Sequence, residues 1–176
     1  MTTIDPHEPA RLETVFVADG RGAFGKPYAL PNDWGIRLDV QEIFWSTSER
    51  GVVRGMHFQL PPHPLNKMVW VSRGSIVDIV VDLRRGATYG NVTEFRLDAS
   101  TGASVWVPVG FAHGFQSLED DTIVNYAVDA PYLPDLDTGV RWDSVDYTWP
   151  LPVGPMSPRD QGFAGVHDFD SPFAAR

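Results

Sequence analysis

The segment Ile76-Val77-Asp78-Ile79-Val80-Val81-Asp82 decides the fold class, and Val92-Thr93-Glu94-Phe95-Arg96-Leu97 follows the same pattern. Polar and apolar residues alternate in both, and a period of two is typical of a β-strand that packs one face against a core. Asp78 and Asp82 are separated by two full β periods, so they share one face of the expected strand. We therefore expect a strand with polar groups inside the fold or at its rim.

Short apolar runs of similar composition recur along the chain. They are rich in Val, Ile, Phe and Trp, and clusters of Gly, Pro, Asp and Ser separate them. The other runs are residues 15–17, 36–40, 52–53, 68–71, 104–107, 114–118 and 122–128. No helical period extends beyond roughly two turns. This rhythm predicts an all-β sandwich, jelly roll or barrel with a few short helices.

Length, charge and composition narrow the possible partners. The chain has 176 residues, of which 43% are hydrophobic, so we expect a single domain over 1–176 with a C-terminal tail from about 150. A net charge of −9 argues against nucleic acid and membrane surfaces as partners. The chain has no cysteine, which excludes disulfides and thiolate ligands. The first residues lack a signal-peptide pattern, so we expect a cytoplasmic protein.

The block Arg50-Gly51-Val52-Val53-Arg54-Gly55-Met56-His57-Phe58-Gln59 contains two candidate functional side chains. On a regular strand Arg54 and His57 point to opposite faces. A β-bulge at Gly55 would turn both toward the same side. Spacing alone also allows a strand with an exposed arginine and a structural histidine.

A second block, Val107-Pro108-Val109-Gly110-Phe111-Ala112-His113-Gly114-Phe115, resembles the second motif of the cupin superfamily, whose fold is a small double-sheet jelly roll. Metal-binding cupins supply two histidines and a glutamate from their first motif. Here that region has His57 alone, with His63 among prolines, so the metal set is incomplete. We expect no metal, and a metal-dependent cupin using His57, His63 and His113 is the alternative.

Several blocks in order resemble the dTDP-4-dehydrorhamnose 3,5-epimerase family, the metal-free cupins of nucleotide-sugar biosynthesis. They extend over residues 18–160 and read R-G-V-V-R-G-M-H-F-Q, L-N-K-M-V-W-V, V-D-L-R, G-A-T-Y-G, V-P-V-G-F-A-H-G-F, N-Y-A-V-D-A-P-Y, G-V-R-W-D and S-P-R-D. The resemblance implies a cofactor-independent isomerase. Its reaction inverts the carbons that flank the ketone of a nucleotide-linked 4-keto-6-deoxyhexose, at C3, C5 or both.

The resemblance also assigns catalytic roles. Removal of a proton next to a ketone, and its return to the other face, needs a base, an oxyanion stabiliser and an acid. The family's base corresponds to His57, and the carboxylate that orients it to Asp160. Its lysine near the enolate oxygen corresponds to Lys67, and its acid to Tyr126.

Binding roles follow in the same way. The substrate-binding residues implied are Arg21, Phe24, Arg54, Gln59, His113 and Tyr132. The arginines would hold the diphosphate, a task that suits a guanidinium fork. His113 would lie beside the base, with Asp78 or Asp82. The resemblance further implies a homodimer in which the N-terminal strand of one subunit brings Arg21 or Phe24 to the other's pocket.

Three positions depart from the family pattern. Lys26 stands where the family has an acid, and Glu42 and Phe44 stand where it has amides. Groups that read a nucleobase discriminate strongly, so these changes leave the base and the sugar open. A single-site epimerase of a tailoring pathway and an inactive sugar-nucleotide binding module therefore stay as alternatives.

Overall fold

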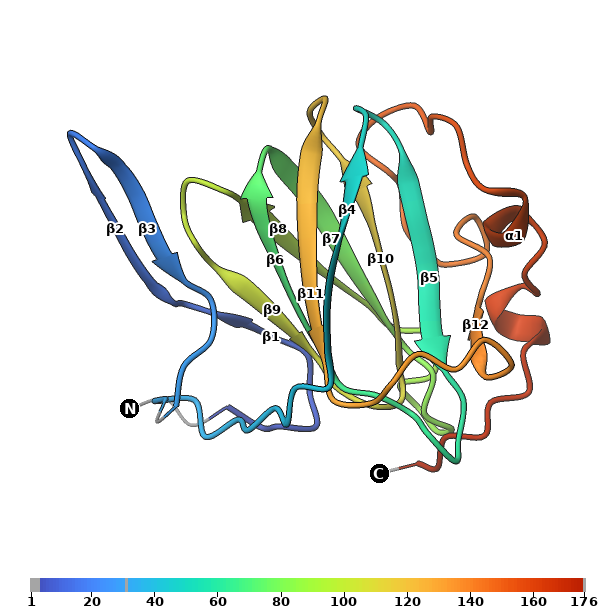
Figure 1. The fold of residues 1–176 in the computed structure, drawn as a ribbon. Coiled ribbons are helices and arrows are strands. Elements are labelled where there is room, and N and C mark those ends of the chain that lie inside the picture. Colours follow the sequence, from blue (N-terminus) through green and yellow to red (C-terminus); the bar gives the residue numbers. More distant parts are fainter. Residues whose placement is uncertain (1–3, 31, 176) are drawn as a thin grey trace.

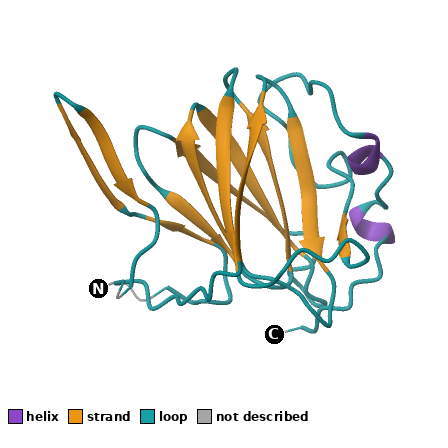
Figure 2. Ribbon diagram, viewed as in Figure 1, coloured by secondary structure: helices purple, strands orange, loops and turns teal. Residues whose placement is uncertain are grey.

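A computed structural model describes residues 4–30 and 32–175, and it confirms the all-β prediction (Figures 1 and 2). The strands are β1 (Ala10–Leu12), β2 (Val15–Asp19), β3 (Gly22–Lys26), β4 (Glu42–Ser48), β5 (Val53–Gln59), β6 (Lys67–Arg73), β7 (Ser75–Asp82), β8 (Val92–Asp98), β9 (Ser104–Val107), β10 (Phe111–Ser117), β11 (Thr122–Val128) and β12 (Asp137–Gly139). Two short helices follow, α1 (Pro158–Gln161) and the 3₁₀ helix η1 (Val166–Asp168).

Two antiparallel five-stranded sheets face each other. The first has the order β1-β9-β6-β11-β4 and the second β12-β5-β10-β7-β8. Strands β2 and β3 form a separate hairpin that projects from the body (Figure 1). Two facing sheets are the arrangement expected of a jelly roll, and each sheet shields the inner face of the other from solvent.

Strand β7 shows why its sequence is almost continuously apolar. Ile76 and Val80 pack into the core between the sheets, whereas Val77 and Ile79 belong to a second core behind the second sheet. A strand covered on both faces needs apolar residues at nearly every position. Asp78 on this strand is nevertheless fully buried, and its partner is described below.

Segments from the two ends of the chain cover the outer faces of the two sheets. Leu12, Ile36 and Leu38 pack with Trp106 on the first sheet. From about residue 150 the tail runs over the second sheet, where Val166 and Phe173 enter the second core (Figure 1). The tail thereby brings α1 into contact with β5. Within 4–30 and 32–175, the structure contains no helix long and apolar enough to cross a membrane.

Candidate active site

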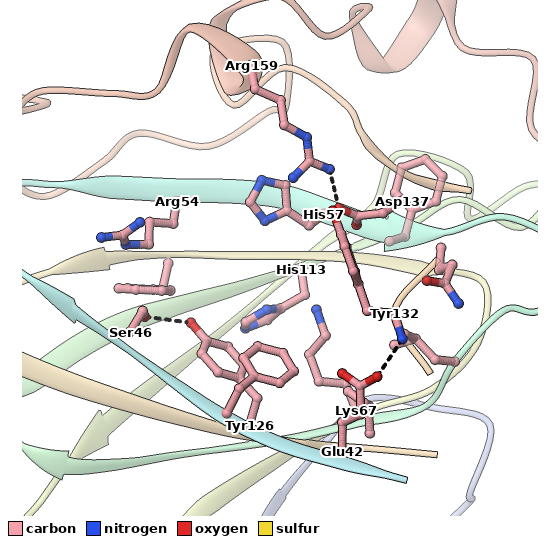
Figure 3. Close-up of a pocket in the computed structure, with 16 residues that line it drawn as sticks. Glu42, Ser46, Arg54, His57, Lys67, His113, Tyr126, Tyr132, Asp137 and Arg159 are labelled. Carbon is pink, nitrogen blue, oxygen red and sulfur yellow. Dashed lines mark hydrogen bonds and ion pairs between the residues drawn. The ribbon is translucent and has the colours of Figure 1, made fainter. Parts of the chain in front are cut away.

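A cavity of about 260 Å³ opens between the two sheets (Figure 3). Its walls come from β4, β5, β6, β10, β11, β12, α1 and the loops beside them. The lining residues are Glu42, Phe44, Ser46, Arg54, His57, Phe58, Gln59, Leu65, Lys67, His113, Phe115, Tyr126, Val128, Tyr132, Asp137 and Arg159. This set includes three of the four side chains predicted to be catalytic, and the fourth, Asp160, lies directly behind His57.

A bulge in β5 turns Arg54 and His57 into the same cavity. His57 lies opposite His113 on β10, whereas Arg54 lies opposite Phe115, so β5 has one residue more than its partner in this interval. Gly55 has φ of +130°, and a Cβ there would lie 2.6 Å from Gly114 Cα. Only glycine fits this conformation and this close approach. The sequence left open both a regular strand and a bulge at Gly55, and the structure has the bulge.

His57 is paired with a carboxylate from the C-terminal tail. Its Nε2 lies 2.9 Å from Asp160 Oδ1, and Oδ2 of the same carboxylate accepts a hydrogen bond from the Gly55 backbone at 3.2 Å. The backbone N–H of Asp160 donates to Ser157 Oγ, which caps α1. Burial alone would raise the pKa of Asp160, but hydrogen bonds and the imidazole charge lower it overall. Asp160 is therefore held as an anion beside His57.

His113 belongs to a second, deeper pair. Its Nε2 lies 2.7 Å from Asp78 Oδ2, and both side chains are almost inaccessible to solvent. Burial lowers the pKa of His113 despite the nearby carboxylate. Asp82, the other candidate partner, pairs instead with Arg84 at 2.6 Å. Among the described residues, no group lies within hydrogen-bond distance of Asp78 Oδ1.

Lys67 begins β6, and its side chain projects into the cavity near His113 (Figure 3). Burial lowers its pKa to about 8, and the charges of Asp137 and Asp78 oppose that shift. In the described part of the chain, no carboxylate oxygen reaches ion-pair distance from its ammonium group. Lys67 is thus a cation available to a ligand.

Tyr126 lies on the wall opposite His57, because β11 and β5 belong to different sheets. Its ring stacks on Phe44 with 4.7 Å between centroids, and its hydroxyl lies 3.2 Å from Ser46 Oγ. Burial raises the pKa of the phenol, so the hydroxyl keeps its proton. Phe44 and Ser46 were not predicted as site residues. In the sequence, Phe44 was distinguished only as a departure from the family pattern.

The other predicted binding residues near the cavity have different environments. Arg54 donates to Ser48 Oγ and to the Thr47 carbonyl, both at 2.9 Å. Gln59 is buried, and its amide bonds to backbone groups of His63, Pro131 and Leu133, so it shapes the loop that carries Tyr132. Tyr132 is half exposed at the mouth. Its backbone N–H donates to Glu42 Oε1 at 2.7 Å.

Three residues singled out in the sequence lie away from this cavity. Arg21, Phe24 and Lys26 all belong to the projecting β2–β3 hairpin. Arg21 is strongly exposed and pairs with Asp19 at 2.7 Å. Within one chain, the hairpin residues therefore do not join the pocket.

The structure adds two charged residues that the sequence did not identify. Asp137 and Arg159 line the cavity and form an ion pair at 2.6 Å (Figure 3). Arg159 was visible only as the neighbour of Asp160. Asp137 gave no signal, because its place beside the pocket depends on β12 pairing with β5.

The ligand set of the metal-dependent alternative is not assembled. Across residues 4–30 and 32–175, no group of three or more His, Cys, Asp or Glu side chains is placed to hold a metal ion. His57 and His113 each direct Nε2 to a carboxylate instead. The donor set therefore does not fit a three-ligand metal site.

Comparisons with known proteins agree with this architecture. A family model described as dTDP-4-dehydrorhamnose 3,5-epimerase matches residues 7–168. A dTDP-4-dehydrorhamnose 3,5-epimerase from Sinorhizobium fredii is 44% identical over 121 residues, which make up 67% of this chain and 60% of that protein. The chain therefore spans less than two thirds of that relative's length.

Two crystal structures resemble the chain over nearly their whole length. A dTDP-4-dehydrorhamnose 3,5-epimerase from Bacillus anthracis with TDP and PPi bound has a TM-score of 0.84 and 34% identity, covering 90% of this chain and 94% of that one. A dTDP-6-deoxy-D-glucose-3,5-epimerase from Legionella pneumophila in complex with dTDP-4-keto-L-rhamnose has a TM-score of 0.88 and 27% identity, covering 99% and 97%. These matches confirm the predicted jelly-roll fold.

Proposed function

The chain belongs to the dTDP-4-dehydrorhamnose 3,5-epimerase family and is an epimerase, and from this premise we propose that it inverts C3 and C5 of a nucleotide-linked 4-keto-6-deoxyhexose without a cofactor. One observation carries the proposal. His57 and Tyr126 line opposite walls of a single cavity, and Lys67, on β6 next to β11, projects into the same cavity. A sugar held there would present its two faces to a base and to an acid.

His57 acts as the base in this proposal. The Asp160 carboxylate can only accept, so the Nε2 that faces it carries the proton and Nδ1 is the free basic nitrogen. The C–H bond next to the ketone breaks, its proton moves to Nδ1, and the electron pair moves onto the ketone oxygen. Asp160 stabilises the imidazolium that forms.

Lys67 and Tyr126 complete the cycle. The ammonium group of Lys67 stabilises the enolate oxygen, a role for which preorganised charge is effective in a partly dry cavity. The oxygen's electron pair then re-forms the ketone, and the enolate carbon takes the proton of the Tyr126 hydroxyl on its opposite face, which inverts that carbon. Exchange with solvent returns a proton to the Tyr126 phenolate and removes one from the His57 imidazolium, so both groups are reset for the next inversion. Its raised pKa supports the acid role, because the phenol stays protonated until a carbanion demands the proton.

Exchange of substrate hydrogen with solvent tests the reaction. With dTDP-4-keto-6-deoxyglucose in D₂O, we expect deuterium at both C3 and C5, measured by NMR at each position. Deuterium at one carbon only would indicate the single-site epimerase, and exchange at neither would contradict the proposal. His57→Asn should abolish exchange and leave nucleotide affinity within a few-fold, whereas an inactive binding module would show no exchange before or after the change.

The nucleobase is a separate part of the proposal. Glu42 and Phe44 line the cavity, whereas Lys26 does not, so two of the three departures lie where they can affect a bound substrate. A panel of dTDP, UDP, GDP and CDP should raise Tm in every case, because each binds the folded state. A dTDP preference of about a hundredfold or more, about 2.7 kcal/mol, would show that other residues read thymine.

We also propose that the chain forms a homodimer. Val15, Val17 and Phe24 are exposed on the projecting hairpin, and Ile43 and Trp45 are exposed on β4, the edge strand of the first sheet. An exposed edge with large apolar side chains favours pairing with another chain.

Light scattering at micromolar concentration should give twice the 19.5 kDa of one chain. If Arg21 acts in the partner's pocket, His57→Asn and Arg21→Ala proteins should each be weak alone and recover activity when mixed. A monomer would contradict the homodimer. The cytoplasmic location and the absence of nucleic-acid binding stay predictions.

A further inference from the structure

Arg159 links α1, the helix that carries Asp160, to β12 in the pocket wall, and the proposed reaction leaves it without a role. Its guanidinium donates to Asp137 Oδ2 at 2.6 Å, and its Cζ lies 5.3 Å from the centroid of the Phe163 ring. Phe163 in turn packs its ring edge-on against His57 at 5.8 Å. The next residue, Asp160, bonds to His57. One short turn of helix therefore contacts both the base and Asp137.

Asp137 matters because it is one of the carboxylates that influence Lys67. Its side chain is mostly buried in the pocket wall and lies on β12, which pairs with β5 beside His57. The charges of Asp137 and Asp78 favour the ammonium form of Lys67, against the effect of burial. An arginine bonded to Asp137 draws that carboxylate's charge away from Lys67 and adds a repelling positive charge.

Lys67 shares its surroundings with groups from every neighbouring element. The acidic, imidazole and phenol groups are Glu42 on β4, His57 on β5, Asp78 on β7, His113 on β10, Tyr126 on β11 and Asp137 on β12, and the cations are Arg54 on β5 and Arg159 on α1. Asp78 is already bonded to His113, and Glu42 accepts from the Tyr132 backbone. Asp137 differs from these two carboxylates because its partner is the half-exposed side chain of Arg159.

We infer that Arg159 is a positioning residue for the reaction, which acts through Asp137 to keep Lys67 a strong hydrogen-bond donor to the enolate oxygen. This inference rests on the proposed function for its catalytic meaning, but the charge coupling it requires is a property of the free protein. A more acidic ammonium is a better hydrogen-bond donor to a developing oxyanion. Arg159 would act without contacting the reacting atoms.

The test reads Lys67 directly. The chain contains two lysines, Lys26 and Lys67, so ¹³Cε labelling of lysine gives one pocket signal and one control signal from the hairpin. In the free wild-type protein we expect the Lys67 signal to titrate near pH 8. Arg159→Gln should raise that midpoint by roughly half a unit or more, because Asp137 is released and a positive charge is lost. Lys26 should not change.

A second variant should shift the Lys67 midpoint in the opposite direction. Asp137→Asn removes a carboxylate that favours the ammonium form, so it should lower the Lys67 midpoint. In the Asp137→Asn background, Arg159→Gln should have a smaller effect than in the wild type, which identifies Asp137 as the intermediary. If Arg159→Gln does not fold, the Asp137→Asn shift still tests the coupling, and no shift there overturns the inference.

Controls separate this role from a structural one and from substrate binding. Arg73→Gln breaks an exposed pair with Asp121 (3.1 Å) at the far end of β6 and should leave the Lys67 titration unchanged. Arg159→Gln should keep the Kd for dTDP within twofold. The same variant should lower kcat severalfold and shift the alkaline limb of the pH profile of kcat to higher pH. Arg159→Lys should restore part of the lost kcat and part of the shift in pH.

The outcomes distinguish this inference from the proposed function. An unchanged or lowered Lys67 midpoint in Arg159→Gln overturns the inference, whatever the enzyme catalyses. A large loss of dTDP affinity would instead make Arg159 a substrate-binding residue and also overturn it. If the titration shifts as expected but no deuterium exchange is observed in any variant, the coupling holds and the proposed reaction fails.

Discussion

Two histidine–carboxylate pairs lie side by side in this protein and differ in almost everything except chemistry. His57 and His113 are direct neighbours across β5 and β10. The His57 side chain is 28% exposed and faces Asp160, whereas His113 is 3% exposed and faces Asp78, which is 0% exposed. The first pair can exchange a proton with a ligand. In the second pair His113 lines the same cavity but exposes almost none of its surface, and Asp78 exposes none.

The carboxylates also reach their histidines by different routes. Asp160 comes from the tail, and its oxygens have further support from the Gly55 backbone. Asp78 comes from β7, the strand next to His113, and its second oxygen has no partner among the described residues. A buried carboxylate with one bond depends strongly on that bond. The comparison thus predicts that damage to the first pair reduces activity and damage to the second reduces stability.

Asp160→Asn should give the largest effect. The carboxylate that holds the tautomer and stabilises the imidazolium is lost, so kcat should fall by about a thousandfold. The free energy of unfolding should change by about 1 kcal/mol or less, because the amide can keep part of the bonding at a partly open site. Steady-state kinetics and urea unfolding measure both quantities. A variant with more than a tenth of wild-type kcat would remove Asp160 from the mechanism.

Asp78→Ala should have the opposite character. It leaves His113 buried without a partner and should lower the free energy of unfolding by about 3 kcal/mol, measured by urea denaturation. The folded enzyme should lose less kcat than Asp160→Asn does. The matched control is Asp170→Ala, which removes an exposed partner of Arg85 and should change stability by less than about 1 kcal/mol. Equal stability losses in the two variants would show that burial does not distinguish the pairs.

Lys67→Met tests a single charge in the pocket in place of a histidine–carboxylate pair. The lowered pKa means that folding disfavours the ammonium form, so the variant should be more stable at pH 7 by about 1 kcal/mol, although inactive. The gain in stability should be smaller than the whole pKa shift would give, because the Lys67 side chain is only partly buried and keeps contact with solvent in the pocket. The gain should shrink as pH rises from about 8 toward 10.5, where the folded and then the unfolded state lose the proton. A loss of stability at pH 7 would contradict the pKa assignment.

The pH dependence of stability in acid should also separate the two pairs, and this is the smallest effect expected. The pKa of His113 is lowered below 6.5, so the unfolded state binds a proton first and stability falls as pH decreases from about 6.5. The pKa of Asp160 is lowered below 3.8, so its contribution is present above 3.8 and is lost only below that pH. Urea unfolding at a series of pH values measures both effects. His113→Gln should remove the fall in the free energy of unfolding that begins near pH 6.5, and Asp160→Asn should remove the fall below pH 3.8. Loss of both falls in one variant would mean that the pairs titrate together.

Much of this site was predictable because its signals are local. The alternation of 76–82 placed Asp78 and Asp82 on one face of a strand, inside the fold or at its rim, and the glycine between Arg54 and His57 offered the bulge that turns both into one cavity. Such patterns follow from a two-residue period and from the conformational freedom of glycine, which need no knowledge of the rest of the chain. The roles of His57, Lys67, Tyr126 and Asp160 came from ordered motifs, and they stay predictions until the variants are measured.

By itself, the sequence determined the all-β class, the absence of disulfides and the order of the motifs. Only the tertiary structure decided that His113 pairs with Asp78 and not with Asp82, that Arg159 reaches Asp137, and that Phe44 stacks on Tyr126. Asp160 lies 103 positions from His57, and such a contact depends on how the tail folds back over the second sheet. Strand period and turn chemistry are encoded within a few residues. Partner choice between distant side chains is set by strand register and by the packing of whole layers.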